Sequence, residues 1–355
     1  MVAAILLFLV GLVLLIKGGD WFVDGATGIA RRFHIPDLII GATVVSIGTT
    51  LPEVMVSAES ALSGHGEIAY GNALGSIICN TALIAALTIA VRPSKVDRST
   101  MKLPVIFFFI AAIFYALNAY LVGEFTRISG IVLLLIFVVY ICLYVKQTMA
   151  SSQTVSVTSA GSVSGSTTSS AGTSERTAGN EGNSGDAAEA SDTASKRGNS
   201  LVKEILLLVV GAVLIAIGAD LLVDNGTIIA EGMGVPESVI ALTFVALGTS
   251  LPELVTAITS LAKGHGALSL GNVIGANLFN LVLVCGISVT LAPFEVPCSK
   301  TIAGLNSSLV VDIPLVFFVM LFLTIPALKK GKLYRWQGVI LLIVYAVFCV
   351  YQFMA

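Results

Sequence analysis

Apolar residues occupy most of this chain in long runs, and polar residues gather in the short stretches between them. A helix needs about twenty apolar residues to cross roughly 30 Å of hydrocarbon, and the runs have about this length. In a bilayer such runs satisfy their backbone polar groups as helices. The pattern predicts an all-α integral membrane protein with ten transmembrane helices, at residues 2–30, 37–62, 67–91, 103–122, 127–147, 203–230, 237–262, 267–291, 307–328 and 335–354.

The polar segment from residue 150 to residue 202 breaks this pattern. It consists mainly of Ser, Thr, Gly and Ala, with almost no large apolar side chains. Such a segment cannot bury enough surface to offset the entropy lost on ordering, so we expect a flexible linker. The linker separates a first membrane half, residues 1–149, from a second half, residues 203–355.

The two halves repeat each other at an offset of 200 residues. The phrase GTTLPE, which ends at Glu53, returns as GTSLPE, which ends at Glu253. In the same way GNALGSIICN, which ends at Asn80, returns as GNVIGANLFN, which ends at Asn280. Self-similarity at a fixed offset indicates an internal structural repeat.

The repeated regions, at about residues 37–91 and 237–291, lie in halves of five predicted spans each. Because five is odd, the halves enter the membrane from opposite sides and form inverted repeats. Basic residues gather in cytoplasmic loops, and here nearly all fall on one side of the ten-span arrangement. We therefore expect a multi-pass protein of the cell membrane, surrounded by the lipid bilayer, with both termini outside and the linker in the cytoplasm. The basic residues on the linker side are Arg31, Arg32, Arg92, Lys95, Arg98, Lys102, the set from Lys146 to Lys203, Lys263, Lys329, Lys330, Lys332 and Arg335, against Arg127 and Lys300 on the other.

The composition agrees with a membrane protein and excludes several other classes. Of the 355 residues, 56% are hydrophobic and 11% are charged, and the mean hydropathy is +0.97. The net charge of -2, with no concentration of basic residues, excludes a nucleic-acid-binding surface. No HExxH or GxSxG motif is present, so no enzyme is predicted.

Glu53 and Glu253 each stand in the middle of a hydrophobic span. A carboxylate at mid-membrane costs at least about 2.5 to 3.5 kcal/mol on insertion scales, so it indicates a functional site. Each glutamate follows a proline, Pro52 or Pro252, that removes a backbone hydrogen bond and kinks or breaks the helix. The carbonyl groups released by the break can bind a cation.

Hydroxyl and amide side chains accompany the two glutamates. Thr49 and Thr249 each precede a glutamate by four residues, so hydroxyl and carboxylate share a helix face. Ser76 and Asn80 repeat this spacing on the third span. Such oxygen donors, without sulfur or imidazole, favour calcium or sodium as bound ions, and they indicate no cofactor. Glycines spaced by four would let the third and eighth helices approach their neighbours closely, namely Gly71, Gly75, Gly271 and Gly275.

The doubled motif resembles the two alpha-repeats of the calcium/cation antiporter superfamily, the sodium/calcium exchangers and their bacterial relatives. The similarity covers all ten spans. It implies alternating access, in which the first and sixth helices slide past the second, third, seventh and eighth helices that hold the ions. It also implies a calcium site formed by Glu53, Glu253, Asn80 and Asn280. Further sodium or calcium ligands implied by the resemblance are the side chains of Thr49, Thr50, Ser76, Thr249 and Ser250 and the carbonyl groups of Ser46 and Ala246.

The resemblance predicts an antiporter, functional as a monomer, that expels calcium from a bacterial or archaeal cytoplasm, driven by inward sodium. Two departures leave the coupling ion open: Ala276 stands where the first repeat has Ser76, and Asn280 stands where some family members carry Asp. One calcium, two sodium ions or two protons would each neutralise the two carboxylates, so calcium/proton exchange is the alternative. Gly75 and Gly275, where the proton-coupled branch usually has glutamate, favour sodium. A cation channel is the rival from another class, but inverted repeats with broken helices favour a transporter.

Two other sets of polar residues also recur between the halves. For the aspartates we expect a helix cap or an interfacial salt bridge with Lys17. For the histidines we expect turns at the level of the lipid headgroups. These residues are Asp20, Asp24, Asp220 and Asp224, and His65 and His265.

Overall fold

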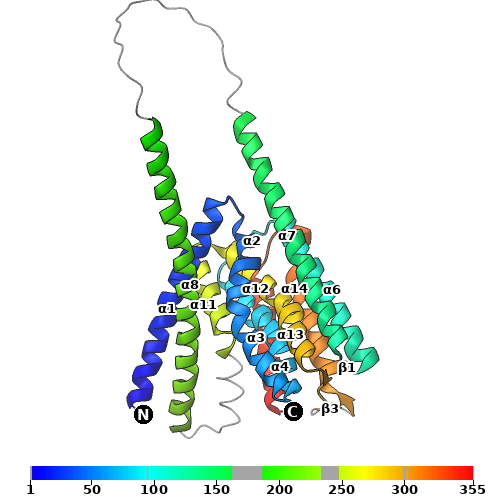
Figure 1. The fold of residues 1–355 in the computed structure, drawn as a ribbon. Coiled ribbons are helices and arrows are strands. Elements are labelled where there is room, and N and C mark those ends of the chain that lie inside the picture. Colours follow the sequence, from blue (N-terminus) through cyan, green and yellow to red (C-terminus); the bar gives the residue numbers. More distant parts are fainter. Residues whose placement is uncertain are drawn as a thin grey trace, which may run out of the picture.

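The computed structural model describes residues 2–93, 95–161, 186–232, 248–298, 301–302 and 304–354. Its first half contains, in chain order, α1 (Val2–Arg32), α2 (Asp37–Ile40), the π-helical turn η1 (Gly41–Val45), α3 (Ser46–Leu62), α4 (Gly66–Cys79), the π-helical turn η2 (Asn80–Ala85), α5 (Ala86–Val91), α6 (Arg98–Leu117), the π-helical turn η3 (Asn118–Val122), strand β1 (Glu124–Phe125) and α7 (Arg127–Gly161). The second half contains α8 (Asp186–Gly232), α11 (Leu251–Ala262), α12 (Gly266–Phe279), the π-helical turn η5 (Asn280–Val284), α13 (Cys285–Leu291), strands β2 (Phe294–Glu295), β3 (Thr301–Ile302) and β4 (Leu305–Asn306), the π-helical turn η6 (Ser308–Asp312), α14 (Ile313–Lys330) and α15 (Arg335–Met354) (Figure 1).

Among the described residues, nine helical segments are long and apolar enough to cross a membrane, and the shorter apolar helix α11 accompanies them. Each of the nine overlaps one of the predicted spans. The span expected at 237–262 is described only from residue 248, so its first part lies outside the described residues. The prediction of an all-α membrane protein with five helices in each half is confirmed.

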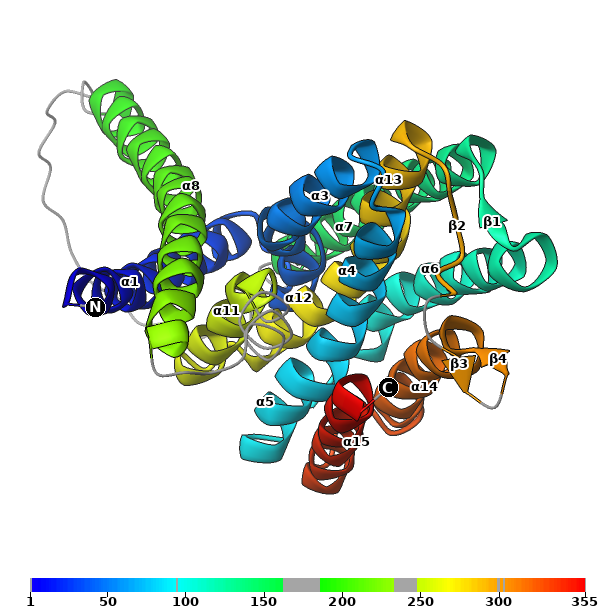
Figure 2. The same cartoon turned by 90° about the horizontal axis from the view of Figure 1, so that it is seen from below.

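The first helices of the two halves, α1 and α8, pack side by side along one edge of the molecule (Figures 1 and 2). They run in opposite directions, because Gly18 packs on Gly211 and Gly11 packs on Gly218. A Cβ atom added to Gly18 would lie 2.9 Å from the Gly211 carbonyl oxygen, so the two backbones touch. Opposite directions of equivalent helices are the signature of inverted topology. We call these two helices the α1–α8 pair.

The other helices form a bundle around α12, which is buried at every residue from Leu268 to Phe279. In Figure 2, α12 lies between α11 and the helices of the first half, and it contacts α2, η1 and α3. Added Cβ atoms at Gly271 and Gly275 would collide with the Leu38 carbonyl and the Ser46 hydroxyl. The close approach predicted for the eighth helix is therefore confirmed.

The equivalent glycines of the third helix, Gly71 and Gly75, have nothing within 4 Å of an added Cβ among the described residues. In the repeat, residues 237–245 are equivalent to α2 and η1. That segment lies outside the described residues, and the predicted approach there stays a prediction.

Two π-helical turns occupy equivalent places in the repeat, since η2 begins at Asn80 and η5 begins at Asn280. Such single wide turns inside helices are frequent at functional sites. The two prolines act differently, and the helix starts anew only at Pro252, since α11 begins at Leu251 after a turn at Thr249 and Ser250. Pro52 lies inside α3 without interrupting it, because a proline that removes one hydrogen bond, here to Gly48, bends a helix more readily than it ends one. Pro252 lies in the first turn of α11, where the missing N–H has no helical partner to lose.

Helical structure extends into the segment where the composition predicts a linker. Helix α7 continues to Gly161 and α8 begins at Asp186, so only residues 162–185 lie outside the described residues in this region. Adding a residue to an existing helix forms one hydrogen bond for each residue that is fixed, and this propagation is much cheaper than starting a helix. Composition alone, which sets the cost of an isolated segment, does not include this effect.

The connecting loops gather at two ends of the bundle. At one end Lys95 pairs with Lys332 in an isolated β-bridge, and Gln147 Nε2 donates to the Ser99 carbonyl at 3.2 Å. The end of α7 and the start of α8 project from the bundle at this end, and the termini and the β1–β2 pair lie at the other (Figure 1). The basic loops around Lys95 and Lys332 therefore share what we call the linker end.

Candidate ion-binding site

Glu53 on α3 and Glu253 on α11 lie at the centre of the site. Both side chains are 0% exposed, and none of their carboxylate oxygens has a hydrogen-bond partner among the described residues. The two carboxyl groups lie near enough to interact electrostatically. Burying two unpaired negative charges together is costly, so the arrangement favours a positively charged ligand between them.

Asn80 and Asn280 supply the amide groups of the site. Each is the first residue of a π-helical turn, each is fully buried, and neither amide has a partner among the described residues. The halves cross here, because α3, which carries Glu53, contacts η5, and α11, which carries Glu253, contacts η2. The site is therefore built between the two halves rather than within either of them.

Two further asparagines hold the threonines of the site. Thr49 Oγ1 donates to Asn272 Oδ1 at 3.3 Å, and Thr249 Oγ1 donates to Asn72 Oδ1 at 3.2 Å. Each bond joins the second span of one half to the third span of the other. A hydroxyl that donates its proton to an amide turns its lone pairs toward a cation, as the outer-shell partners of metal ligands do.

Asn72 and Asn272 were given no role by the sequence reasoning. The sequence does contain a feature that could have identified them, since both are polar residues in apolar spans and occupy equivalent positions in the repeat. Their function as partners of Thr49 and Thr249 depends on contacts between the halves, which the sequence does not display.

The remaining hydroxyls predicted for the site are buried as well. Thr50 and Ser250 are at most 2% exposed, and their hydroxyl oxygens have no partner among the described residues. Ser76 is 4% exposed, and its equivalent Ala276 is fully buried. The first half therefore contributes one hydroxyl more than the second.

Ser46 lies where α3 follows the π-helical turn η1. Its hydroxyl donates to the Gly41 carbonyl at 2.6 Å and to the Asn272 carbonyl at 2.9 Å. Its own carbonyl oxygen accepts a long bond of 3.5 Å from Thr49. The equivalent residue Ala246 lies outside the described residues, so its predicted carbonyl ligand has no structural counterpart here.

The donor set fits a hard cation. Carboxylate, amide and hydroxyl oxygens are the ligands that calcium and sodium take, whereas zinc and copper take sulfur and imidazole. Within the described part of the chain, no three His, Cys, Asp or Glu residues gather as a metal-binding cluster. The site thus combines two carboxylates with neutral amide and hydroxyl oxygens.

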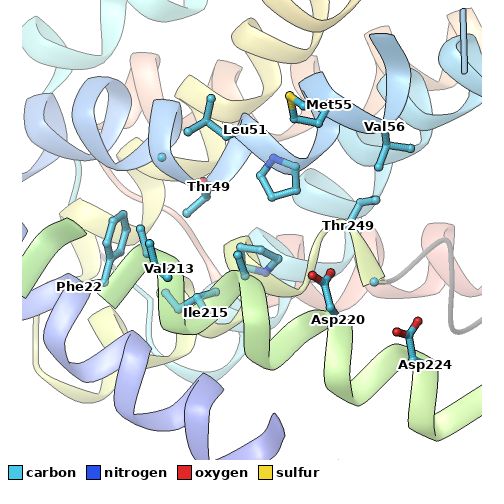
Figure 3. A pocket seen from close by; sticks show the side chains of 16 residues that line it. Phe22, Thr49, Leu51, Met55, Val56, Val213, Ile215, Asp220, Asp224 and Thr249 are labelled. Atoms are coloured by element: carbon cyan, nitrogen blue, oxygen red, sulfur yellow. The ribbon is translucent and has the colours of Figure 1, made fainter. Parts of the chain in front are cut away.

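A cavity of about 530 Å³ separates the α1–α8 pair from α3 and α11 and reaches the site at Thr49 and Thr249 (Figure 3). Phe22 and Ile215 line its apolar part. Asp220 and Asp224 project from α8 beside it, farther along the helix from the linker end. From Thr49 and Thr249 the cavity extends toward Asp220 and Asp224, away from the linker end.

The aspartates of the first half have a different partner from the one expected. Lys263, in the turn after α11, lies 3.4 Å from Asp20 Oδ1 and 2.8 Å from Asp24 Oδ1, whereas Lys17 is exposed on α1. The expectation of a pair with Lys17 is wrong, because the turn between two distant helices reaches α1. The histidines do lie in turns, and His265 Nε2 is 3.4 Å from Arg31 Nη2.

Comparison with known proteins gives matches along almost the whole chain. The family described as sodium/calcium exchanger protein matches residues 3–146 and 203–354. An uncharacterized membrane protein of Methanocaldococcus jannaschii is 32% identical over 342 residues, 96% of this chain and 95% of that protein. The sodium/calcium exchanger MaX1 of Methanosarcina acetivorans is 29% identical over 370 residues, 98% of each chain. A solved structure of the sodium-calcium exchanger NCX_Mj covers 98% of this chain and 97% of its own, at 30% identity and a TM-score of 0.73.

Proposed function

Because this chain belongs to the sodium/calcium exchanger protein family, we propose that it is a secondary active antiporter that expels cytoplasmic calcium in exchange for external sodium. The observation that carries the proposal is the buried cluster of Glu53, Glu253, Asn80 and Asn280, whose polar side-chain atoms all lack partners in the described structure. Buried polar groups are normally paired, so such a cluster calls for a ligand. The relatives named as sodium/calcium exchangers support calcium and sodium as that ligand.

Charge balance explains how two ions of different valence compete for this cluster. Two carboxylates are neutralised by one calcium ion or by two sodium ions. Either load makes the buried site electrically neutral, whereas the unloaded site keeps two negative charges in a medium of low dielectric constant. The loaded protein therefore changes conformation more readily than the unloaded one, and this difference couples the two fluxes.

Alternating access requires one part of the protein to move against another. The α1–α8 pair is held together by close backbone contacts at Gly18 and Gly211. The cavity beside the site separates this pair from α3 and α11 over part of their length. We propose that the pair slides as a unit and opens the site to each side of the membrane in turn.

The distribution of basic residues supports an orientation with both termini outside. Lys95 and Lys332 lie together at the linker end, which would face the cytoplasm. The cavity that reaches Thr49 and Thr249 would then open toward the outside, where sodium is supplied.

Calcium/proton exchange is a second candidate, and Ala276 favours it. This buried residue has no hydroxyl where Ser76 supplies one in the first half, so the second half offers sodium one ligand fewer. Protons need no such ligand. The coupling ion is therefore the quantity to measure.

The experiment is radiolabelled calcium uptake into proteoliposomes whose outward gradient is sodium, potassium or protons alone. Wild-type protein is compared with Glu53→Gln and Glu253→Gln, and with Glu59→Gln as a matched control. Glu59 is an exposed carboxylate on the same helix as Glu53. We expect saturable uptake that requires internal sodium, is lost in the two site variants and persists in the control.

Other outcomes decide against parts of the proposal. Uptake driven equally well by protons without sodium would establish calcium/proton exchange. Calcium flux that needs no counter-ion and does not saturate would identify a channel. Full uptake in both site variants would show that Glu53 and Glu253 do not bind the ions.

A further inference from the structure

A set of buried polar side chains continues from the site along α11 and α12, two helices that contact each other. It consists of Thr256 and Ser260 on α11 and Ser269 and Asn272 on α12, each at most 1% exposed. The hydroxyl oxygens of the first three and the amide nitrogen of Asn272 have no hydrogen-bond partner among the described residues. We call these four residues the polar track.

The spacing of these residues connects the polar track to the ion site. Thr256 and Ser260 follow Glu253 by three and seven residues, so all three lie on one face of α11, over a rise of about 10 Å. On α12, Asn272 accepts the hydrogen bond of the site residue Thr49, and Ser269 precedes it by three residues on the same face. Each helix therefore carries polar groups that begin at the site and continue toward the turn between α11 and α12.

The other end of the polar track lies at the turn that joins the two helices. The His265 amide donates to the Ser260 carbonyl at 2.7 Å, and the Ser269 amide donates to the His265 carbonyl at 3.2 Å. His265 is in contact with Arg31, the penultimate residue of α1. Arg32 in turn pairs with Glu204 near the start of the described second half, so this turn belongs to the linker end.

The first half matches the polar track only in part, because two of the four polar residues have apolar equivalents there. Asn72 Nδ2 donates to Ser57 Oγ at 2.8 Å and to the Glu53 carbonyl at 3.3 Å, whereas Ala257 at the equivalent position offers Asn272 no hydroxyl. The equivalents of Thr256 and Ser269 are Val56 and Ala69, whereas Ser60 matches Ser260. A polar set needed only to hold the asparagine would look alike in both halves. The additional hydroxyls of Thr256 and Ser269 therefore point to a role that the first half does not share.

Buried hydroxyl and amide groups without protein partners are normally satisfied by water or ions. A hydroxyl can donate to water and can offer lone pairs to a cation, so a row of them can replace part of a hydration shell. An apolar passage between α11 and α12 would instead expose a cation to the full cost of desolvation.

We propose that the polar track is the route by which the cation passes between the site and the linker end of the protein. This proposal rests on the proposed function, because it supplies the second of the two openings that exchange requires. In the conformation described, α1 lies over the adjoining face of α11, where Gly19 packs on Val255 and Thr259, and Lys263 binds Asp20 at the turn. Sliding of the α1–α8 pair would uncover the end of the polar track that lies at the turn between α11 and α12.

The direct test is the accessibility of cysteines placed along the track. Thr256→Cys, Ser260→Cys and Ser269→Cys are made singly in a protein whose five native cysteines are replaced by alanine. A membrane-impermeant methanethiosulfonate is applied from the cytoplasmic or the external side of oriented vesicles, and modification is measured by mass spectrometry. Thr324→Cys is the matched control, since Thr324 is a buried hydroxyl on α14 that donates to its own helix at Met320.

We expect modification of all three track cysteines from the cytoplasmic side, at a rate that changes with the sodium and calcium gradients, and none at Thr324→Cys. Absence of cytoplasmic modification in a variant that still exchanges calcium would overturn the proposal. Modification in a protein that exchanges no calcium would support the polar track as an access route and would contradict the proposed function instead.

A flux measurement separates a pathway from a structural role. The triple variant Thr256→Val, Ser260→Ala and Ser269→Ala should lower the maximal exchange rate by about tenfold or more, with the half-saturating external sodium concentration changed less than about twofold. Thr324→Val, which removes a hydroxyl satisfied within its own helix, should leave both quantities near the wild-type values. An unchanged maximal rate in the triple variant would contradict the proposal.

Discussion

Lys263 Nζ lies 2.8 Å from Asp24 Oδ1 and joins the turn after α11 to α1. The same ammonium group donates to the Asp20 carbonyl at 2.8 Å. In the first half Ser63 occupies the position equivalent to Lys263, so no lysine from that position can reach Asp220 or Asp224. The two end states of the proposed sliding motion therefore differ in their ion pairs. The conformation described is the one that the contacts of Lys263 with Asp20 and Asp24 stabilise.

Lys263→Ala should shift the protein away from this conformation. The charged side chains are 26% and 55% exposed, so the pair contributes on the order of 0.2 to 1 kcal/mol, as exposed pairs do. That energy corresponds to a rise of about 1.4- to fivefold in the half-saturating external sodium concentration, since the outward-open state binds sodium. The measurement is sodium-dependent calcium exchange in oriented proteoliposomes.

The matched control for this prediction is Lys17→Ala, which removes an exposed lysine from α1 itself. It should leave the sodium dependence unchanged. An equal shift in both variants would mean that net charge near α1, rather than the contact with Asp24, sets the balance of conformations.

Glu53→Gln and Glu253→Gln should each make the ion-free protein more stable. Each change removes one of two fully buried carboxylates that lack partners in the described structure, and it keeps the side-chain shape. Relief of the unpaired charge should raise the free energy of unfolding by about 1 kcal/mol or more. Thermal unfolding in detergent with a calcium chelator measures the effect.

The same variants should lose their response to calcium. In wild-type protein, calcium at a hundred times its dissociation constant adds about 2.7 kcal/mol of stability, because it binds the folded state alone. In the glutamine variants the added stability should fall below about 1 kcal/mol. Glu59→Gln should behave as wild type in both measurements, and a glutamine variant that keeps the full calcium response would argue against the site.

The sequence predicted the spans and the main oxygen donors because both can be recognised from short stretches of the chain. An apolar run long enough for a bilayer is recognisable residue by residue, and Glu53 and Glu253 stand out because a carboxylate in such a run is costly. Their doubling at a fixed offset indicates a repeat, and the odd number of spans in each half indicates that the repeats are inverted. The opposite directions of α1 and α8 agree with this in the structure.

What the sequence did not predict depends on contacts between distant segments or on backbone geometry. The partner of Asp24 is Lys263, more than two hundred residues away, and the nearer Lys17 was the only partner visible from local spacing. The π-helical turns at Asn80 and Asn280 change the hydrogen-bond pattern without a distinctive residue pattern. The effect of Pro52 depended on whether its neighbours hold the helix together, and they do.

Asn272→Ala should weaken ion binding although Asn272 is no predicted ligand. It removes the acceptor that orients the Thr49 hydroxyl, and loss of such outer-shell partners typically costs about 10- to 100-fold in ion affinity. A double-mutant cycle with Thr49→Val separates this role from general packing. We expect the two changes to be strongly non-additive for calcium affinity and the half-saturating calcium concentration of the double variant to equal that of Thr49→Val.

Asn72→Ala provides the comparison within the repeat. Asn72 also donates to Ser57 and to the Glu53 carbonyl, so its loss should reduce the yield of folded protein as well as the ion affinity. Additive effects of Asn272→Ala and Thr49→Val would show that Asn272 does not act through the threonine.

Ala276→Ser should strengthen sodium binding. Residue 276 precedes Asn280 by four residues, as Ser76 precedes Asn80, so the new hydroxyl would lie on the site face of α12 and restore the symmetry of the donor set. Ala276 is fully buried, and a single oxygen is the smallest addition that supplies a ligand. We expect the half-saturating sodium concentration to fall by about two- to tenfold, because the hydroxyl supplies an oxygen that the second half lacks. Calcium, whose predicted ligands are Glu53, Glu253, Asn80 and Asn280, should change little. Ala276→Cys, which adds similar volume with a poor ligand for hard cations, is the control, and an equal gain in both variants would assign the effect to packing.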